Sequence, residues 1–161
     1  MERTPIEDGT ALYDLVVGVY NLVFPDAITV DDIDLYWIDS GRVEAEIEFP
    51  ALGLNRKAWN EIWTPERQLE VLLHEFAHIE EGPGERDHGP LFYHRLSELT
   101  WLAQDHQAEL EALFGVGLDF DAVREHVVDS VNEHTVEAAV DSIADRQDAL
   151  REEFASADSG E

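Results

Sequence analysis

The residues best suited to chemistry are two histidines and a glutamate in the segment His74-Glu75-Phe76-Ala77-His78. In a helix, residues four positions apart lie above one another on one face, so both imidazoles can reach one metal ion. Glu75 is rotated by about 100° from His74, from where it can contact a water on that ion. The segment therefore predicts a zinc site with His74 and His78 as ligands and Glu75 as the general base.

A catalytic zinc ion usually has three protein ligands and one water, so a third ligand is expected elsewhere in the chain. His88 is the first candidate, because it follows the turn-forming sequence Gly82-Pro83-Gly84 and precedes Pro90, which suits the start of a helix. From there it can face back towards the first two histidines. Glu98 and His94 share a face of the next predicted helix, and they rank second and third.

Apolar residues at helical spacing predict helices over residues 8–24, 64–81 and 90–114. Thr64 is a good N-cap and Pro65 suits the first turn, so they favour the start of the second helix. On that helix, the apolar residues fall on one side and the polar triplet occupies an adjacent sector. The helix can therefore bury one face and still present its histidines.

Three strands are expected between the first and second helices. Residues 34–38 are rich in aromatic and branched side chains, residues 43–49 alternate apolar residues with glutamates, and residues 51–55 form a short extended segment. The expected fold class is α+β, with an N-terminal helix, a small and mostly antiparallel sheet, and two further helices.

The chain after the third helix has a different character. Two amphipathic stripes predict an acidic helical hairpin or extension over residues 119–155, and residues 156–161 have nothing to bury and are expected to be disordered. The second stripe also permits a coiled-coil dimer, although two helices folded on each other or on the first domain are the simpler interpretation. The expected domain boundary therefore follows residue 114.

The active-site segment followed by His88-Gly89-Pro90-Leu91-Phe92 resembles the SprT-like zinc metallopeptidases, whose signature is HExxH, a loop and then HGxxF. The resemblance covers about residues 8–103. It implies a minimal zincin core, zinc ligated by His74, His78 and His88, Glu75 as the catalytic base, and hydrolysis of peptide bonds in protein substrates. Many members end in a cysteine zinc ribbon, which this chain lacks, and some act on DNA–protein crosslinks.

The charge of the chain is strongly negative. The 161 residues carry 37 acidic and 10 basic side chains, a net charge of −27, with Lys57 the single lysine. Such a charge repels nucleic acids and anionic membranes, so neither is an expected partner. The composition is similar to that of cytoplasmic proteins from extreme halophiles, in which salt screens the repulsion.

Other features narrow the class of protein. The absence of cysteine excludes disulfides, zinc ribbons and thiol nucleophiles. Residues 1–9 lack the pattern of a signal peptide, and the longest apolar run is too short to span a bilayer, so a cytoplasmic protein is expected. The sequence does not fix the oligomeric state.

Two other functions remain open. Zinc can be purely structural in a regulatory or adaptor protein that acts through its C-terminal helices, or the chain can be a repressor-cleaving HExxH peptidase. For a peptidase, Tyr93, His94 and Arg95 are candidate oxyanion donors by their position in the sequence. An extended substrate is hypothesised to add as a strand along residues 51–55.

Overall fold

The computed structural model describes residues 3–130 apart from residues 8, 40, 42 and 80–89. Its elements confirm the α+β class and follow the expected order, except that an unpredicted short strand at residues 3–5 precedes the first helix. A further helical segment covers residues 120–130. Two short helical turns, Val30–Asp32 and Ala58–Ile62, precede β2 and α2. The remaining elements are β1 (Arg3–Pro5), α1 (Ala11–Val23), β2 (Asp34–Ile38), β3 (Ala45–Glu48), β4 (Ala51–Asn55), α2 (Pro65–His78), α3 (Pro90–Asp105) and α4 (Gln107–Phe114).

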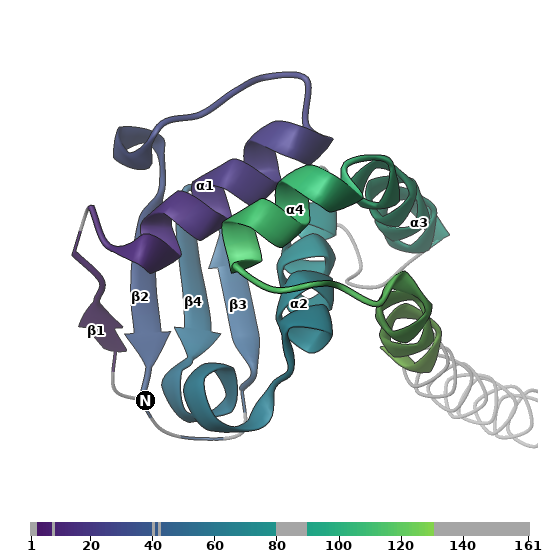
Figure 1. Cartoon of the computed structure of the whole chain (residues 1–161). Coiled ribbons are helices and arrows are strands. Elements are labelled where there is room, and N and C mark those ends of the chain that lie inside the picture. Colours follow the sequence, from purple (N-terminus) through teal and green to yellow (C-terminus); the bar gives the residue numbers. More distant parts are fainter. Residues whose placement is uncertain (1–2, 8, 40, 42, 80–89, 131–161) are drawn as a thin grey trace, which may run out of the picture. The chain divides into compact units, whose positions relative to one another are not determined.

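The four strands form one mixed sheet in the order β1-β2-β4-β3 (Figure 1). β1 pairs with β2, and β3 with β4, in antiparallel fashion, whereas β2 and β4 are parallel. Two of the three strand pairs are thus antiparallel, as predicted. β4 lies between β2 and β3, and its Leu52 and Leu54 are fully buried.

Gly53 in β4 leaves room for the Tyr36 side chain of β2 to lie across β4. A Cβ atom there would lie 2.4 Å from Cε2 of the Tyr36 ring, so a larger residue would displace that ring. The hydroxyl of Tyr36 in β2 donates a hydrogen bond of 2.5 Å to Glu46 in β3. One side chain therefore joins the two strands that flank β4.

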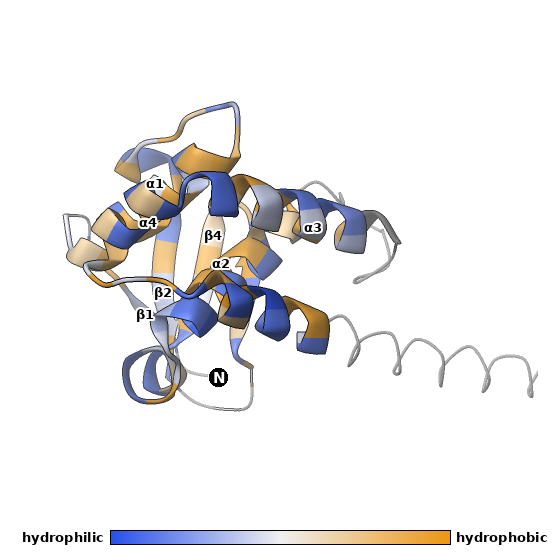
Figure 2. Ribbon diagram, turned by 45° about the vertical axis from the view of Figure 1, so that its right-hand side comes forward, coloured by the Kyte–Doolittle hydropathy of each residue, from blue (hydrophilic) through white to orange (hydrophobic). Residues whose placement is uncertain are grey.

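Helices cover one face of the sheet (Figure 1). Apolar residues run along α1 and along the strands β2 and β4 (Figure 2), and Val16 and Val19 of α1 are fully buried. Tyr13 fixes α1 to the chain around β2, because its hydroxyl accepts a hydrogen bond from the Leu35 backbone N–H at 3.0 Å and donates one to the Ile33 carbonyl at 3.1 Å.

α2 starts as predicted. The Thr64 side chain accepts a hydrogen bond of 3.3 Å from the Arg67 backbone N–H, and Pro65 occupies the first turn. Phe76 is fully buried and packs edge-on against the ring of Tyr20 in α1, with ring centres 5.5 Å apart. The described helix ends at His78, and the rest of the predicted helix from residue 80 lies outside the described residues.

The prediction of one helix over residues 90–114 is wrong. His106 has non-helical backbone angles (φ −110°, ψ 28°) and separates α3 from α4. The break lets α4 turn onto α1, where Leu113 lies against Gly18 so closely that a Cβ there would be 2.8 Å from it. Tertiary packing, which local sequence spacing does not contain, explains the difference.

The chain divides by its contacts into two units, residues 1–127 and residues 128–161. The first unit includes residues 119–127, where Phe120 and Val123 are buried. The extension predicted for residues 119–155 thus begins with residues that belong to the first unit. Its remainder from residue 131, with the predicted tail at 156–161, lies outside the described residues. None of the described helices combines the length and apolarity that spanning a membrane requires.

Candidate metal centre

α2 places His74 and His78 one turn apart, with their ring centres 5.2 Å from each other and their planes at 66°. Zinc–nitrogen bonds of about 2.0–2.1 Å put the centre of an imidazole about 3.2 Å from the ion, so two ligands at a tetrahedral angle have ring centres about 5.2 Å apart. The observed separation matches this value. The separation of the two ring centres is therefore compatible with two ligands of one tetrahedral ion.

Phe92 of α3 packs against both imidazoles. Its ring centre lies 4.9 Å from that of His74 and 4.4 Å from that of His78, and it is stacked on His78 with 26° between the planes. The side chain is almost completely buried. This contact gives the two rings an apolar wall, which limits their rotation and keeps water from one side of them.

Glu75 follows His74 on the helix and is 7% exposed. A carboxylate so far removed from water needs polar partners. Its position between the two histidines in the sequence is the one that general-base chemistry at an HExxH zinc site requires.

Glu70 is a residue of the site that the sequence interpretation missed. It lies one turn before His74 on α2 and is fully buried, and its Oε1 lies 4.0 Å from Nδ1 of His74. The Arg67 guanidinium forms an ion pair with its Oε2. Burial raises the pKa of Glu70 to about 7, and the charge of Arg67 opposes that rise.

A signal for Glu70 was present in the sequence. Arg67, Glu70 and His74 are spaced by three and four residues, which places them on one face of a helix. Glutamates are rarely fully buried, so in an acid-rich chain this spacing is most simply interpreted as a charged surface of the helix.

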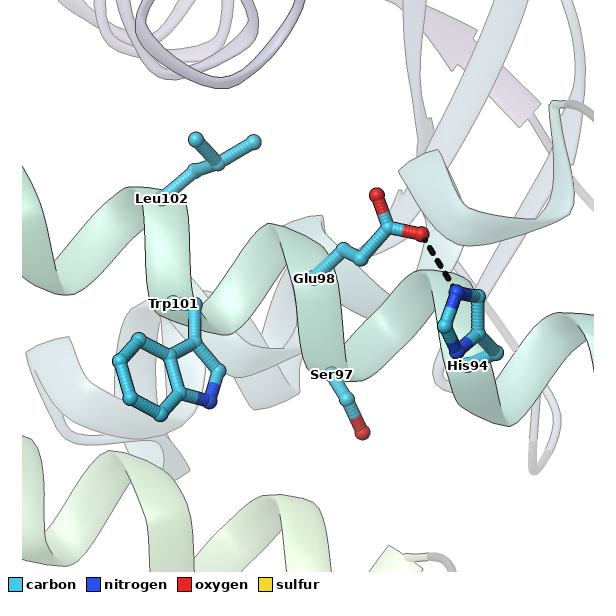
Figure 3. Close-up of a pocket in the computed structure, with 5 residues that line it drawn as sticks. All are labelled: His94, Ser97, Glu98, Trp101 and Leu102. Carbon is cyan, nitrogen blue, oxygen red and sulfur yellow. Dashed lines mark ion pairs between the residues drawn. The ribbon is translucent and has the colours of Figure 1, made fainter.

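The structure does not bring Glu98 or His94 into a metal-binding group with the histidine pair. Among the described residues, no three histidine, cysteine, aspartate or glutamate side chains are placed to hold a metal ion. Glu98 instead forms ion pairs with His94 at 2.9 Å and with Arg95 at 3.1 Å, on an exposed face of α3 that also carries Trp101 (Figure 3). His88 lies outside the described residues.

The three candidate oxyanion donors differ in their surroundings. His94 is 76% exposed and bound to Glu98. Arg95 lies with its guanidinium 5.2 Å from the centre of the Phe24 ring. The hydroxyl of Tyr93 is buried and has no hydrogen-bond partner among the described residues, so Tyr93 is the candidate with a free donor.

The hypothesis that a substrate adds along residues 51–55 is wrong. β4 pairs with β2 on one side and with β3 on the other, so its backbone hydrogen-bonding groups are used within the sheet. The edge beside α2 belongs to β3 (Figure 1). The sequence predicted the strand correctly but not its place in the sheet.

Comparison of the chain with protein-family models, with curated proteins and with solved structures finds no match.

Proposed function

We propose that this chain is a zinc-dependent peptidase that cleaves peptide bonds in protein substrates. The 5.2 Å separation of the two imidazole rings carries the proposal, because it is the spacing of two ligands on one tetrahedral zinc ion. His74 and His78 are the proposed ligands. His88 is proposed as the third, on the strength of its sequence context and the resemblance to SprT-like metallopeptidases.

The chemistry is shared between the ion and Glu75. Zinc bound in such a site polarises a carbonyl and lowers the pKa of a coordinated water. Glu75 accepts a proton from the attacking water and passes it to the leaving amine. Its burial supports this role, because proton transfer is most effective from a group that bulk water does not compete with.

The sheet offers a place for an extended substrate. β3 pairs with β4 along one side, and along its other side it has no strand partner in the described part of the chain. The Glu44 carbonyl accepts a hydrogen bond of 2.8 Å from the Asn55 N–H. By the alternation of an antiparallel pair, the N–H groups of Ala45 and Ile47 then point to the open edge. We propose that the substrate pairs with these groups.

The proposal is tested by zinc analysis beside peptidase assays on fluorescently labelled casein. The wild-type chain should hold one zinc ion, and His74→Ala should lose it. Glu75→Gln should keep the zinc and lower the cleavage rate by about 10²-fold or more, because it removes the general base. His106→Ala is the matched control, since this histidine precedes α4 and pairs with Glu109, and it should change neither quantity.

The same measurements separate the alternatives. Zinc retained by the wild type without any cleavage, and no difference between wild type and Glu75→Gln, would favour the structural role in a regulator or adaptor. A wild-type chain that binds no zinc contradicts both the peptidase and the zinc-stabilised adaptor.

A further inference from the structure

Glu70 combines complete burial with an unused hydrogen-bonding atom. Its Oε2 pairs with Arg67, but its Oε1 has no hydrogen-bond partner among the described residues. A buried carboxylate oxygen left without a donor is costly, so its retention calls for an explanation. Nδ1 of His74 lies 4.0 Å from this oxygen.

The surroundings of Glu70 hold its carboxylate in place. Arg67 also forms an ion pair of 2.6 Å with Glu44, immediately before β3, and its guanidinium lies 5.6 Å from the centre of the Trp63 ring. Arg67 therefore has a second acidic partner and does not depend on Glu70 for one. Glu70 is therefore not needed to neutralise Arg67. Its Oε1 lies 4.0 Å from Nδ1 of His74, one turn further along the helix.

The distance between Glu70 and His74 is about 1 Å longer than a hydrogen bond, so the hydrogen bond inferred below requires one of the two side chains to move by about that amount. Histidines that bind metals usually donate the N–H of their second ring nitrogen to a carboxylate or carbonyl. That hydrogen bond fixes the ring orientation and tautomer and makes the ligating nitrogen more basic. Nδ1 faces Glu70, which leaves Nε2 for the ion.

We propose that Glu70 is a positioning residue of the metal centre, which accepts a hydrogen bond from Nδ1–H of His74 and is itself held by Arg67. This inference rests on the proposed zinc site. It also explains why one oxygen of a fully buried carboxylate has no other hydrogen-bond partner among the described residues.

The test is the zinc dissociation constant of the full chain, measured by competition with a chromogenic chelator. Glu70→Leu removes the acceptor and should raise the constant by about 10- to 100-fold, the usual effect of losing such a partner. Glu70→Gln keeps a carbonyl acceptor without the charge, so it should give a smaller rise. Glu44→Gln is the matched control, because it removes the other acidic partner of Arg67 and leaves His74 its acceptor; it should bind zinc like the wild type.

A second measurement distinguishes positioning from a general loss of structure. In the zinc-loaded protein with ¹⁵N-labelled histidine, the Nδ1–H proton of His74 should give a slowly exchanging signal in the wild type and lose this protection in Glu70→Leu. The melting temperature of the metal-free chain should change little in Glu70→Leu, because Arg67 keeps its ion pair with Glu44 and an apolar residue fills the buried position.

The outcomes are separable. If the wild type binds zinc and Glu70→Leu binds it within twofold as tightly, the inference is overturned and the proposed peptidase stands. If the wild type binds no zinc, the proposed function fails first and the inference fails with it. An unchanged Nδ1–H signal in Glu70→Leu would also overturn the inference.

Discussion

At the scale of single residues, the candidate centre depends on how two imidazole rings are held before any ion arrives. Phe92 contacts both rings, and it does so from a different helix, so α3 fixes side chains that α2 carries. An aromatic wall restricts the rings without itself offering a hydrogen bond to their nitrogens. Ordering the rings in advance reduces the entropy that zinc binding must overcome.

Replacement of Phe92 by alanine should therefore have two effects. It should lower the free energy of unfolding of the metal-free chain by about 3–5 kcal/mol, because a large buried ring is lost, as urea denaturation measures. It should also weaken zinc binding by about 10-fold, because the rings lose their wall. Phe92→Leu preserves most of the apolar contact and should show much smaller changes in both.

Leu99→Ala is the control for the cavity alone. Leu99 lies on the same helix, two turns after Phe92, and is fully buried. It should destabilise the chain by about 2–4 kcal/mol and leave the zinc affinity unchanged. Equal zinc affinity in Phe92→Ala and wild type would reduce Phe92 to a packing residue.

At the scale of elements, the sheet is fastened across its central strand by one side chain. Tyr36 reaches over Gly53 to Glu46, and burial together with that carboxylate raises the pKa of Tyr36 to about 12. A tyrosine in the unfolded chain has a pKa of about 10. The neutral phenol is thus favoured by folding, which links the stability of the sheet to pH.

The sign of that linkage gives a prediction. The contribution of Tyr36 to stability is complete below about pH 10 and is lost as the pH rises through about 12, because the folded state holds the proton longer. The advantage of wild type over Tyr36→Phe in unfolding free energy should shrink by about 1 kcal/mol across that range, after allowance for partial solvent screening. Denaturation series at several alkaline pH values measure it. A constant difference would show that Tyr36 titrates normally.

The elements also show how far local sequence patterns reach. Apolar and aromatic residues placed β2 at 34–38 and β4 at 51–55 with the bounds that the structure has, and the Thr64 cap placed the start of α2. These features depend on neighbours in the chain. The position of β4 inside the sheet and the break at His106 depend on contacts between distant segments, so local patterns did not reveal them.

In the candidate site, too, some features follow from neighbours in the chain and others from contacts between distant segments. The histidine pair was predictable, because its geometry follows from the helical repeat alone. Glu70 was not recognised, because its burial arises from the packing around α2 and its ion pair with Arg67 is completed from the sheet by Glu44. The pairing of Glu98 with His94 and Arg95 likewise follows from the direction in which α3 turns its faces, which packing sets.

The open edge of β3 provides a test of the substrate hypothesis. Ala45→Pro removes a backbone N–H that points away from the sheet, so it should lower kcat/KM for casein cleavage by about 10-fold, the effect of one lost hydrogen bond. Ala45→Ser retains the N–H and should behave like the wild type. Zinc content should be unchanged in both variants. Undiminished cleavage by Ala45→Pro would show that substrates bind elsewhere.

At the scale of the whole molecule, the net charge of −27 on 161 residues sets the conditions under which the fold is stable. The described ion pairs compensate part of it, since Arg3, Arg56 and Arg124 each bind an acidic partner. Most acidic side chains have no such partner available, because they outnumber the basic ones by 37 to 10. Their mutual repulsion favours expansion of the chain, and screening by salt opposes that expansion.

Stability should consequently rise with salt concentration. The screening length falls from about 10 Å at 0.1 M to about 3 Å at 1 M, which removes repulsion between all but adjacent charges. The melting temperature of the chain, followed by circular dichroism, should therefore increase continuously from dilute buffer to about 2 M potassium chloride, and cleavage activity should follow it. This behaviour is the one expected of a protein from an extreme halophile.

A charge-reduced variant separates screening from other effects of salt. Asp26, Glu61 and Glu125 are exposed, and replacing them together by Asn, Gln and Gln changes the net charge from −27 to −24, since −27 + 3 = −24. If repulsion governs the salt response, the variant should be more stable than wild type in dilute buffer and should gain less from added salt. Because screening and charge removal act on the same energy, their effects should be less than additive. If the melting temperatures of the two proteins instead rise equally with salt concentration, the response is due to the effect of salt on apolar burial, which does not depend on net charge.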